Sequence, residues 1–81
     1  MNRGAMWMTT WQLTVEGMSC SHCKAAVEST LYDLPYVQRA DADFATGQVV
    51  VLATGHLSEA MLQDAVEEAG YRLMSATMLH A

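Results

Sequence analysis

The spacing of apolar and polar residues predicts a strand followed by a helix in the first half of the chain. Trp11, Leu13 and Val15 alternate with polar residues, which is the period expected of a half-buried strand. The helix that follows ends before Pro35, because the residue preceding a proline avoids helical angles. The residues with the spacing of one apolar helical face are Cys23, Ala26, Val27, Thr30, Leu31 and Leu34.

Two further strands are predicted in the middle of the chain, joined as a hairpin. Residues 36–44 form the first, although their imperfect alternation leaves open which side chains are buried. Residues 48–53 form the second, a β-branched run typical of a central strand, and residues 45–47 form the tight turn between them. The candidates for the buried side of the first of these strands are Val37, Ala40 or Ala42, and Phe44.

A second helix and a last strand complete the pattern. Ser58 is suited to cap the N-terminus of the helix, and Gly70 stands where a left-handed C-terminal cap belongs. Residues 71–78 are expected to form the last strand. The inward-facing residues of the helix are Met61, Leu62, Ala65, Val66 and Ala69, whereas Asp64, Glu67 and Glu68 face water.

The resulting order, βαββαβ, predicts an α+β fold of the ferredoxin-like type. In this fold a four-stranded antiparallel sheet carries two helices on one face, and we expect the other sheet face to be largely solvated. The domain is expected to span residues 10–78, after a flexible lead-in over residues 1–9 that lacks clear periodicity. The residues expected to contribute to the core are Leu31, Leu34, Val50, Leu52, Leu62 and Val66.

Composition and charge exclude several classes of function. The 81 residues are 52% apolar, which suffices for one modest core, and they contain no apolar run of the roughly 18 residues that a membrane span requires. Nine acidic residues outnumber four basic ones, so the net charge of −5 leaves no basic patch for nucleic acid or an anionic membrane. The N-terminus does not resemble a secretory signal, so we expect a cytoplasmic protein whose partner carries a basic face.

The chain has two cysteines, Cys20 and Cys23, where a loop over residues 17–22 meets the first predicted helix. Helix N-termini favour the thiolate form, and Lys24 adds a nearby cation. Thiolates are soft ligands, and two of them suit Cu(I), which accepts two-coordinate binding. Zn(II) prefers four ligands, and the chain has no second CxxC motif to complete them. The pair therefore indicates a Cu(I) site.

The residues around the cysteines resemble a known family. The run Gly17-Met18-Ser19-Cys20-Ser21-His22-Cys23 matches the GMxCxxC signature of the heavy-metal-associated domain, and the resemblance continues through residues 24–28 and 68–71. The resemblance implies that Cys20 and Cys23 hold Cu(I) and that the metal passes to a copper-transporting P-type ATPase or its metal-binding domains. The chain is accordingly expected to be either a free copper chaperone or a soluble domain of such a transporter.

Three positions near the cysteines bear on the site through the same resemblance. The family's buried loop methionine falls on Met18, which we expect to pack in the core, and the aromatic residue that faces the metal falls on Tyr71, which either packs or limits access to the metal. Zinc-handling relatives commonly have Asp where this chain has Ser19, and mercury and zinc relatives more often have Phe in place of Tyr71. Copper is therefore favoured, with Zn(II), Ag(I) and Cd(II) as alternatives.

The three histidines have weaker claims to a role. His22 lies between the two cysteines, so it is either a third ligand, a contact within a metal-bridged homodimer, or a solvent-exposed residue at the start of the helix. Its position at the start of the helix favours a solvent-exposed side chain. His56, in a loop, and His80, near the C-terminus, are both expected to be solvated.

Other functions of a CxxC motif fit the sequence less well, so no enzymatic activity is expected. A thiol–disulfide oxidoreductase has a longer domain with a proline opposite the motif, whereas Pro35 stands at a helix end here. A structural zinc module needs more ligands, and covalent haem attachment needs His where the chain has Lys24. We expect Cu(I) to be transferred by ligand exchange, in which an incoming thiolate attacks the two-coordinate ion before an original sulfur leaves.

Overall fold

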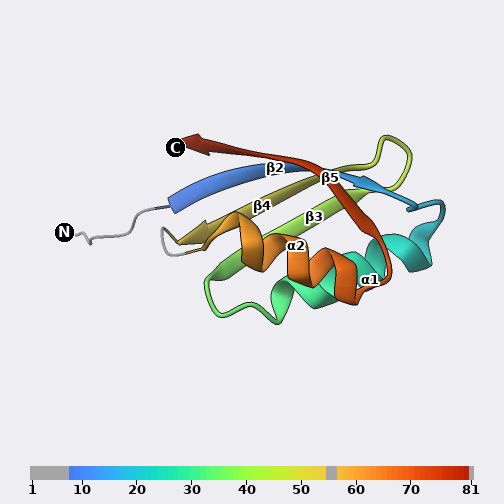
Figure 1. Cartoon of the computed structure of the whole chain (residues 1–81), viewed down its shortest axis with the longest axis horizontal. Helices are drawn as coiled ribbons and strands as arrows, with labels where there is room; N and C mark the ends of the chain where they lie inside the picture. Colours follow the sequence, from blue (N-terminus) through green and yellow to red (C-terminus); the bar gives the residue numbers. More distant parts are fainter. Residues whose placement is uncertain (1–7, 55–56, 81) are drawn as a thin grey trace.

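The βαββαβ order is confirmed by the computed structural model, which describes residues 8–54 and 57–80. The elements form one antiparallel sheet in the order β3-β4-β2-β5, with both helices packed on one face (Figure 1). Neither helix has the length and apolar character that crossing a membrane would require, among the residues described. The elements are β2 (Met8–Glu16), α1 (Ser21–Tyr32), β3 (Val37–Asp43), β4 (Gln48–Thr54), α2 (Glu59–Glu68) and β5 (Arg72–His80).

The central strand β2 follows the predicted alternation. Trp11, Leu13 and Val15 are buried beneath the helices, and the strand begins at Met8, two residues before the start that the pattern indicated. Of the N-terminal lead-in, residues 1–7 lie outside the described residues, as does His56.

The orientation of β4 differs from the prediction. Val49, Val51 and Ala53 are fully buried, whereas Val50 is 45% exposed and Leu52 is partly exposed on the open face of the sheet. The prediction that Val50 and Leu52 contribute to the core was therefore wrong. An uninterrupted apolar run carries no alternation that could fix which face is buried, and a shift of one residue exchanges the two faces. The pairing with β2 determines the buried face instead, because this register places Val49 opposite Leu13 and Val51 opposite Trp11.

The buried residues of the edge strand β3 agree only in part with the prediction. Ala40 and Ala42 are both buried, since residues two apart share a face, but Phe44 lies beyond the strand and is 38% exposed. The assignment of Phe44 to the buried side was wrong for that reason. The alternation is imperfect because the register shifts between Val37 and Arg39, which leaves one extra residue on β3.

The helices bury the faces that their spacing predicted. Leu31 of α1 and Leu62 and Val66 of α2 are fully buried, whereas Leu34 lies past the end of α1 and is only partly buried. The predicted cap of α2 is confirmed, because the Ser58 hydroxyl accepts a hydrogen bond of 3.3 Å from the backbone N–H of Met61.

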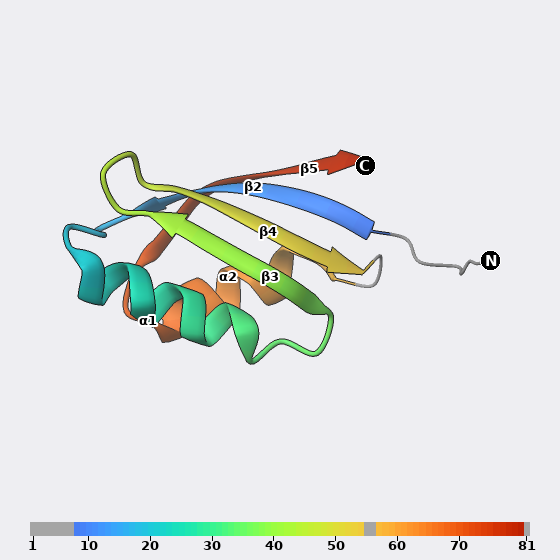
Figure 2. The ribbon, with the colours of Figure 1, turned by 180° about the vertical axis from the view of Figure 1, so that it is seen from behind.

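A half-buried carboxylate ties α1 to β3, along which the helix packs (Figure 2). Glu28 Oε2 accepts a hydrogen bond of 2.8 Å from the Ala42 N–H and also pairs with the Lys24 ammonium, which lies 3.8 Å from Asp41 Oδ1. Desolvation opposes ionisation of Glu28, but its bonds to Lys24 and Ala42 outweigh that effect and lower the pKa of its carboxyl. The contact anchors the helix that carries Cys23.

We predict that Glu28→Ala lowers the free energy of unfolding by about 1–3 kcal/mol at neutral pH, because the buried Ala42 N–H loses its acceptor. Urea denaturation measures the change. The pKa of Glu28 is lower in the folded state, so its contribution is present above the ordinary carboxyl pKa and is lost as the pH falls through the folded value. The deficit of the variant should therefore shrink in acid. Glu68→Ala, at an exposed position of α2, is the matched control and should change stability by less than about 0.5 kcal/mol.

Candidate metal centre

The loop between β2 and α1 is held at its base and exposed at its tip. Gly17 follows the end of β2 with a φ of +107°, a conformation that side chains disfavour. Met18 is buried in the core cluster, as predicted, whereas Ser19 and Cys20 are exposed. One buried methionine thus fixes a loop whose next residues reach solvent.

Gly17 also gives the aromatic ring of Tyr71 room to approach the loop. A Cβ added at Gly17 would lie 3.1 Å from Cδ1 of Tyr71, which is closer than ordinary van der Waals contact. The glycine of the motif therefore serves two purposes, because it permits the turn and allows the ring to lie directly against the backbone of the loop. The sequence motif showed the glycine but not the residue that requires it.

The two cysteines lie at the N-terminus of α1. Cys20 is the N-cap residue, with extended backbone angles, and its carbonyl accepts the first helical hydrogen bond from Lys24 N–H at 3.1 Å. The Cys20 side chain makes no capping hydrogen bond, so its exposed thiol is not committed to the helix. Cys23 lies in the first turn, where it is partly buried against the core. The helix starts at Ser21, so the loop ends two residues earlier than the predicted range of 17–22.

The geometry allows the two sulfurs to share one ion. Both cysteines are free, and their Sγ atoms lie 3.6 Å apart. With metal–sulfur bonds of about 2.3 Å, two ligands stand about 3.8 Å apart at a tetrahedral angle and about 4.6 Å apart in a line. The observed spacing is near the first value, and a linear complex needs the sulfurs to separate by about 1 Å. The exposed side chain of Cys20 has the freedom to make that movement.

The C-terminus of α2 places Tyr71 beside the cysteines. The helix ends in the Schellman arrangement, in which Tyr71 N–H donates to the Val66 carbonyl at 3.2 Å and Gly70 N–H donates to the Glu67 carbonyl at 2.9 Å. Gly70 has a φ of +95°, so the predicted left-handed cap is confirmed. The two helix ends therefore meet at one point, one contributing the thiols and the other the phenol.

Hydrogen bonds at this point stabilise the thiolate of Cys23. The bond from the Tyr71 hydroxyl is the largest influence, followed by one from the Ser19 backbone, and together with contacts to Cys20 they lower the pKa of Cys23 to about 6. The same bond raises the pKa of Tyr71. Lys24, expected to act as a nearby cation, is instead engaged by the carboxylates of α1 and β3. At neutral pH the site thus holds at least one thiolate.

His22 is helical and exposed, as the sequence favoured. Within residues 8–54 and 57–80 no three side chains among His, Cys, Asp and Glu are grouped so that they could hold a metal ion. The roles of His22 as a third protein ligand or as a contact in a metal-bridged dimer stay predictions.

The sequence did not predict the hydrogen bond between Glu28 and Ala42 that anchors α1, because only the four-residue spacing of Lys24 and Glu28 is visible in the sequence.

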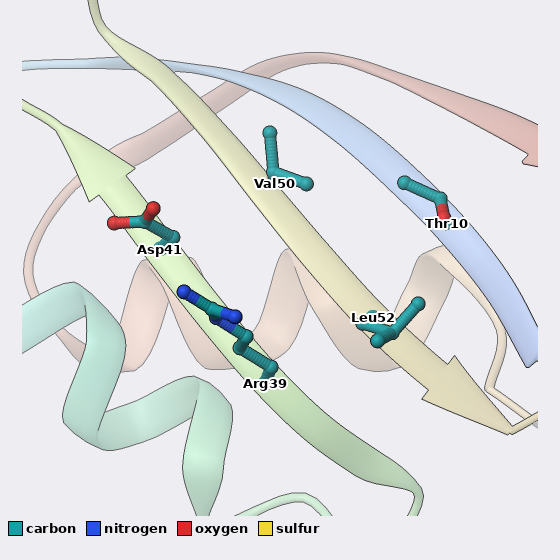
Figure 3. Close-up of a pocket in the computed structure, with 5 residues that line it drawn as sticks. All are labelled: Thr10, Arg39, Asp41, Val50 and Leu52. Atoms are coloured by element: carbon teal, nitrogen blue, oxygen red, sulfur yellow. The ribbon is translucent and has the colours of Figure 1, made fainter.

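A hollow of about 310 Å³ lies elsewhere, on the sheet face opposite the helices (Figure 3). Its lining residues come from β2, β3 and β4, and they are Thr10, Arg39, Asp41, Val50 and Leu52. It contains neither thiol, so it is separate from the cysteine pair. The exposed loop, rather than a cavity, is the candidate metal centre.

The fold and the paired thiols on this loop define a small metal-binding domain, and the chain belongs to the heavy-metal-associated domain family, whose model matches residues 12–72. It is 45% identical over 60 residues to the copper chaperone CopZ of Staphylococcus aureus, covering 73% of this chain and 88% of that protein. The solved structure of a CopZ metallochaperone is similar, with 41% identity and a TM-score of 0.77 over 80% of this chain and 98% of that one.

A transporter domain has the same fold. The N-terminal domain of a potential copper-translocating P-type ATPase from Bacillus subtilis, solved in the Cu(I)-loaded state, has a TM-score of 0.74 and 27% identity. The similarity covers 86% of this chain and 91% of that domain. This fold therefore occurs in both kinds of protein that the resemblance implied.

We predict that Tyr71→Phe raises the pKa of the Cys23 thiol, because the variant keeps the ring but loses the hydroxyl that donates to the thiolate. The rate of iodoacetamide alkylation, followed by peptide mass spectrometry in metal-free protein, measures the thiolate fraction. In the original chain the rate at Cys23 should fall as the pH drops through about 6, and in the variant it should fall at higher pH. Tyr36→Phe is the control for loss of a hydroxyl elsewhere. An unchanged profile in Tyr71→Phe would contradict the assignment.

Proposed function

We propose that this protein is a copper metallochaperone that carries Cu(I) on Cys20 and Cys23 and passes it by ligand exchange to a copper-transporting P-type ATPase. The observation that carries the proposal is the pair of free sulfurs, 3.6 Å apart at an exposed loop. The relationship to copper chaperones supports it, because the chain aligns with most of their length.

The donor set favours Cu(I) over Zn(II). Two soft thiolates suffice for a monovalent copper ion, whereas a structural zinc site needs four ligands that close around the metal. Among the described residues, no His, Asp or Glu side chain is grouped with Cys20 and Cys23 so as to complete a metal site. The solved Cu(I)-loaded ATPase domain of the same fold is consistent with this choice. Ag(I), the closest chemical analogue, is expected to bind in the same way, and Zn(II) and Cd(II) more weakly.

The unequal exposure of the two cysteines suggests the order of transfer. An acceptor thiolate approaches from solvent and forms a bond to the ion, which becomes three-coordinate. The bond to the exposed Cys20 breaks first, and its thiolate is then free to take up a proton from water. A second acceptor thiolate displaces Cys23. Copper stays in the +1 state throughout, so no electron acceptor is needed.

Tyr71 and Met18 support the site without binding the metal. The hydroxyl of Tyr71 favours the thiolate form of Cys23, which keeps that sulfur available to the metal at neutral pH, and partial burial makes Cys23 the less accessible of the two sulfurs. Met18, buried beneath the loop, holds its base in place while Cys20 moves. His22 lies on the exposed side of α1, where an acceptor or a second copy of the chain would approach.

The proposed setting is the cytoplasm, where thiols remain reduced. A P-type ATPase domain with the same fold provides a matching acceptor, since two such loops can share one ion between them. A homodimer bridged by copper through the exposed sulfurs would use the same chemistry. If the chain functions as a soluble domain of the ATPase, the two thiols act as acceptor before they act as donor. In each case the protein binds and transfers a metal, and no bond in a substrate is made or broken.

We predict that Cys20→Ser and Cys23→Ser each weaken Cu(I) binding by more than about 100-fold, because each removes one of the two ligands. Loss of a residue that only hydrogen-bonds to a ligand costs roughly 100-fold at most. Anaerobic competition with a chromogenic Cu(I) chelator measures the affinity. Ser29→Ala, at an exposed position of the same helix, should bind copper normally. Circular dichroism should show the same fold in all three variants, since Cys20 is exposed and Cys23 only partly buried. A cysteine variant that retains the original affinity would exclude that sulfur as a ligand.

A further inference from the structure

The two edges of the sheet differ in charge. The edge strand β3 carries Arg39, Asp41 and Asp43, all exposed. The opposite edge, β5, has no charged residue between Arg72 and His80. Charged side chains are one of the ways in which proteins prevent an edge strand from pairing with another molecule. One edge of this sheet is thus protected in that way, and the other is not.

The uncharged edge is also open to solvent. β5 pairs with β2 on one side, and both views of the ribbon show no other helix or strand of the described residues along its outer side (Figures 1 and 2). Met74, Met78 and Leu79 are 53%, 47% and 43% exposed, respectively. An edge strand leaves a row of backbone N–H and C=O groups without partners in the sheet, which another extended strand can satisfy.

A bulge limits the part of β5 that can pair. Thr14 stands opposite Ser75 and Val15 opposite Leu73, so Met74 is an extra residue on β5. Bulges twist a strand locally and interrupt its ladder, which excludes the start of β5 from regular pairing. The regular part of the strand that remains begins at Ser75.

This regular segment is complementary to itself. In an antiparallel pair, residues that stand opposite each other share a face of the sheet. A two-fold axis at Thr77 places Ala76 opposite Met78 of the second copy and Ser75 opposite Leu79 of the second copy. Each large apolar side chain then faces a small one, and the two Thr77 residues form a cross-strand pair of a favourable type.

The charge of the protein also selects this edge for a second copy. With a net charge of −5, two copies repel each other over most of their surface. If two copies paired through β3, its acidic residues Asp41 and Asp43 would face acidic residues of the second copy. β5 contains no acidic residue, so its backbone and side chains can meet without like charges directly opposite.

We propose that Ser75–Leu79 of β5 pairs antiparallel with the same segment of a second copy, forming a homodimer that requires no metal. The contact joins two four-stranded sheets into one continuous sheet. The cysteine loops belong to the β2–α1 connection and not to this edge, so both remain accessible. Each copy therefore binds and transfers copper independently, unlike a dimer bridged through the thiols.

Sedimentation equilibrium of the metal-free double variant Cys20→Ser/Cys23→Ser tests the proposal, because this protein cannot form a thiol-bridged dimer. The apparent mass should rise with concentration from one chain toward two. Adding Thr77→Lys should weaken the association at least about tenfold, since two lysines then stand opposite each other. The matched control is Gln38→Lys, which adds the same charge to an exposed position of the other edge strand and should leave the association unchanged.

Amide hydrogen exchange of the unmodified chain provides a measurement that depends on no substitution. Exchange within residues 75–79 should slow as the concentration rises, while exchange in β3 stays constant. A mass of one chain up to millimolar concentration, equal association in the Thr77→Lys and Gln38→Lys variants, or concentration-independent exchange in β5 would each overturn the proposal. Thr77→Lys in the original chain should bind Cu(I) normally, so failure of the dimer and failure of copper binding are distinguishable.

Discussion

The interaction between Tyr71 and Cys23, which lowers the pKa of the Cys23 thiol, is the one on which the site depends. It forms because two helix ends meet there. α1 begins with the cysteines, and α2 ends at Gly70, whose positive φ turns the chain so that Tyr71 reaches the loop. Gly17 completes the arrangement by leaving room for the ring. Residues distant in the sequence therefore act together on the protonation of one thiol.

For the proposed transfer of copper, this arrangement reconciles retention of the metal with its release. A closed cage of four ligands would hold an ion firmly but would give an acceptor no position from which to attack. Here Cys23 is held by core contacts, whereas Cys20 is exposed and makes no capping bond. One sulfur thus provides stability and the other provides access. The anchor between Glu28 and Ala42 matters for the same reason, because it keeps the helix that carries Cys23 in place.

The parts of the structure that local sequence determines were predictable, and those set by distant pairing were not. The Ser58 cap, the Gly70 terminus and the alternation in β2 each depend on a few neighbouring residues, and all are confirmed. The buried face of β4 depends on its register with β2, which an apolar run such as residues 49–53 does not encode locally. The position of the CxxC motif could likewise be read from the sequence. The bond from Tyr71 could be anticipated only through the family resemblance.

For the proposed function, charge adds a constraint on the acceptor. Two thiolates and a monovalent copper ion would leave the loaded site with one negative charge, so loading would not neutralise a chain whose net charge is already −5. The one lysine near the site, Lys24, is engaged by Glu28 and Asp41 and cannot offset that charge without breaking its pairs. An acceptor must also present thiolates, which adds repulsion at the point of transfer. Attraction between the two proteins therefore has to come from basic residues that surround the acceptor's thiols, and association should weaken as salt screens these charges.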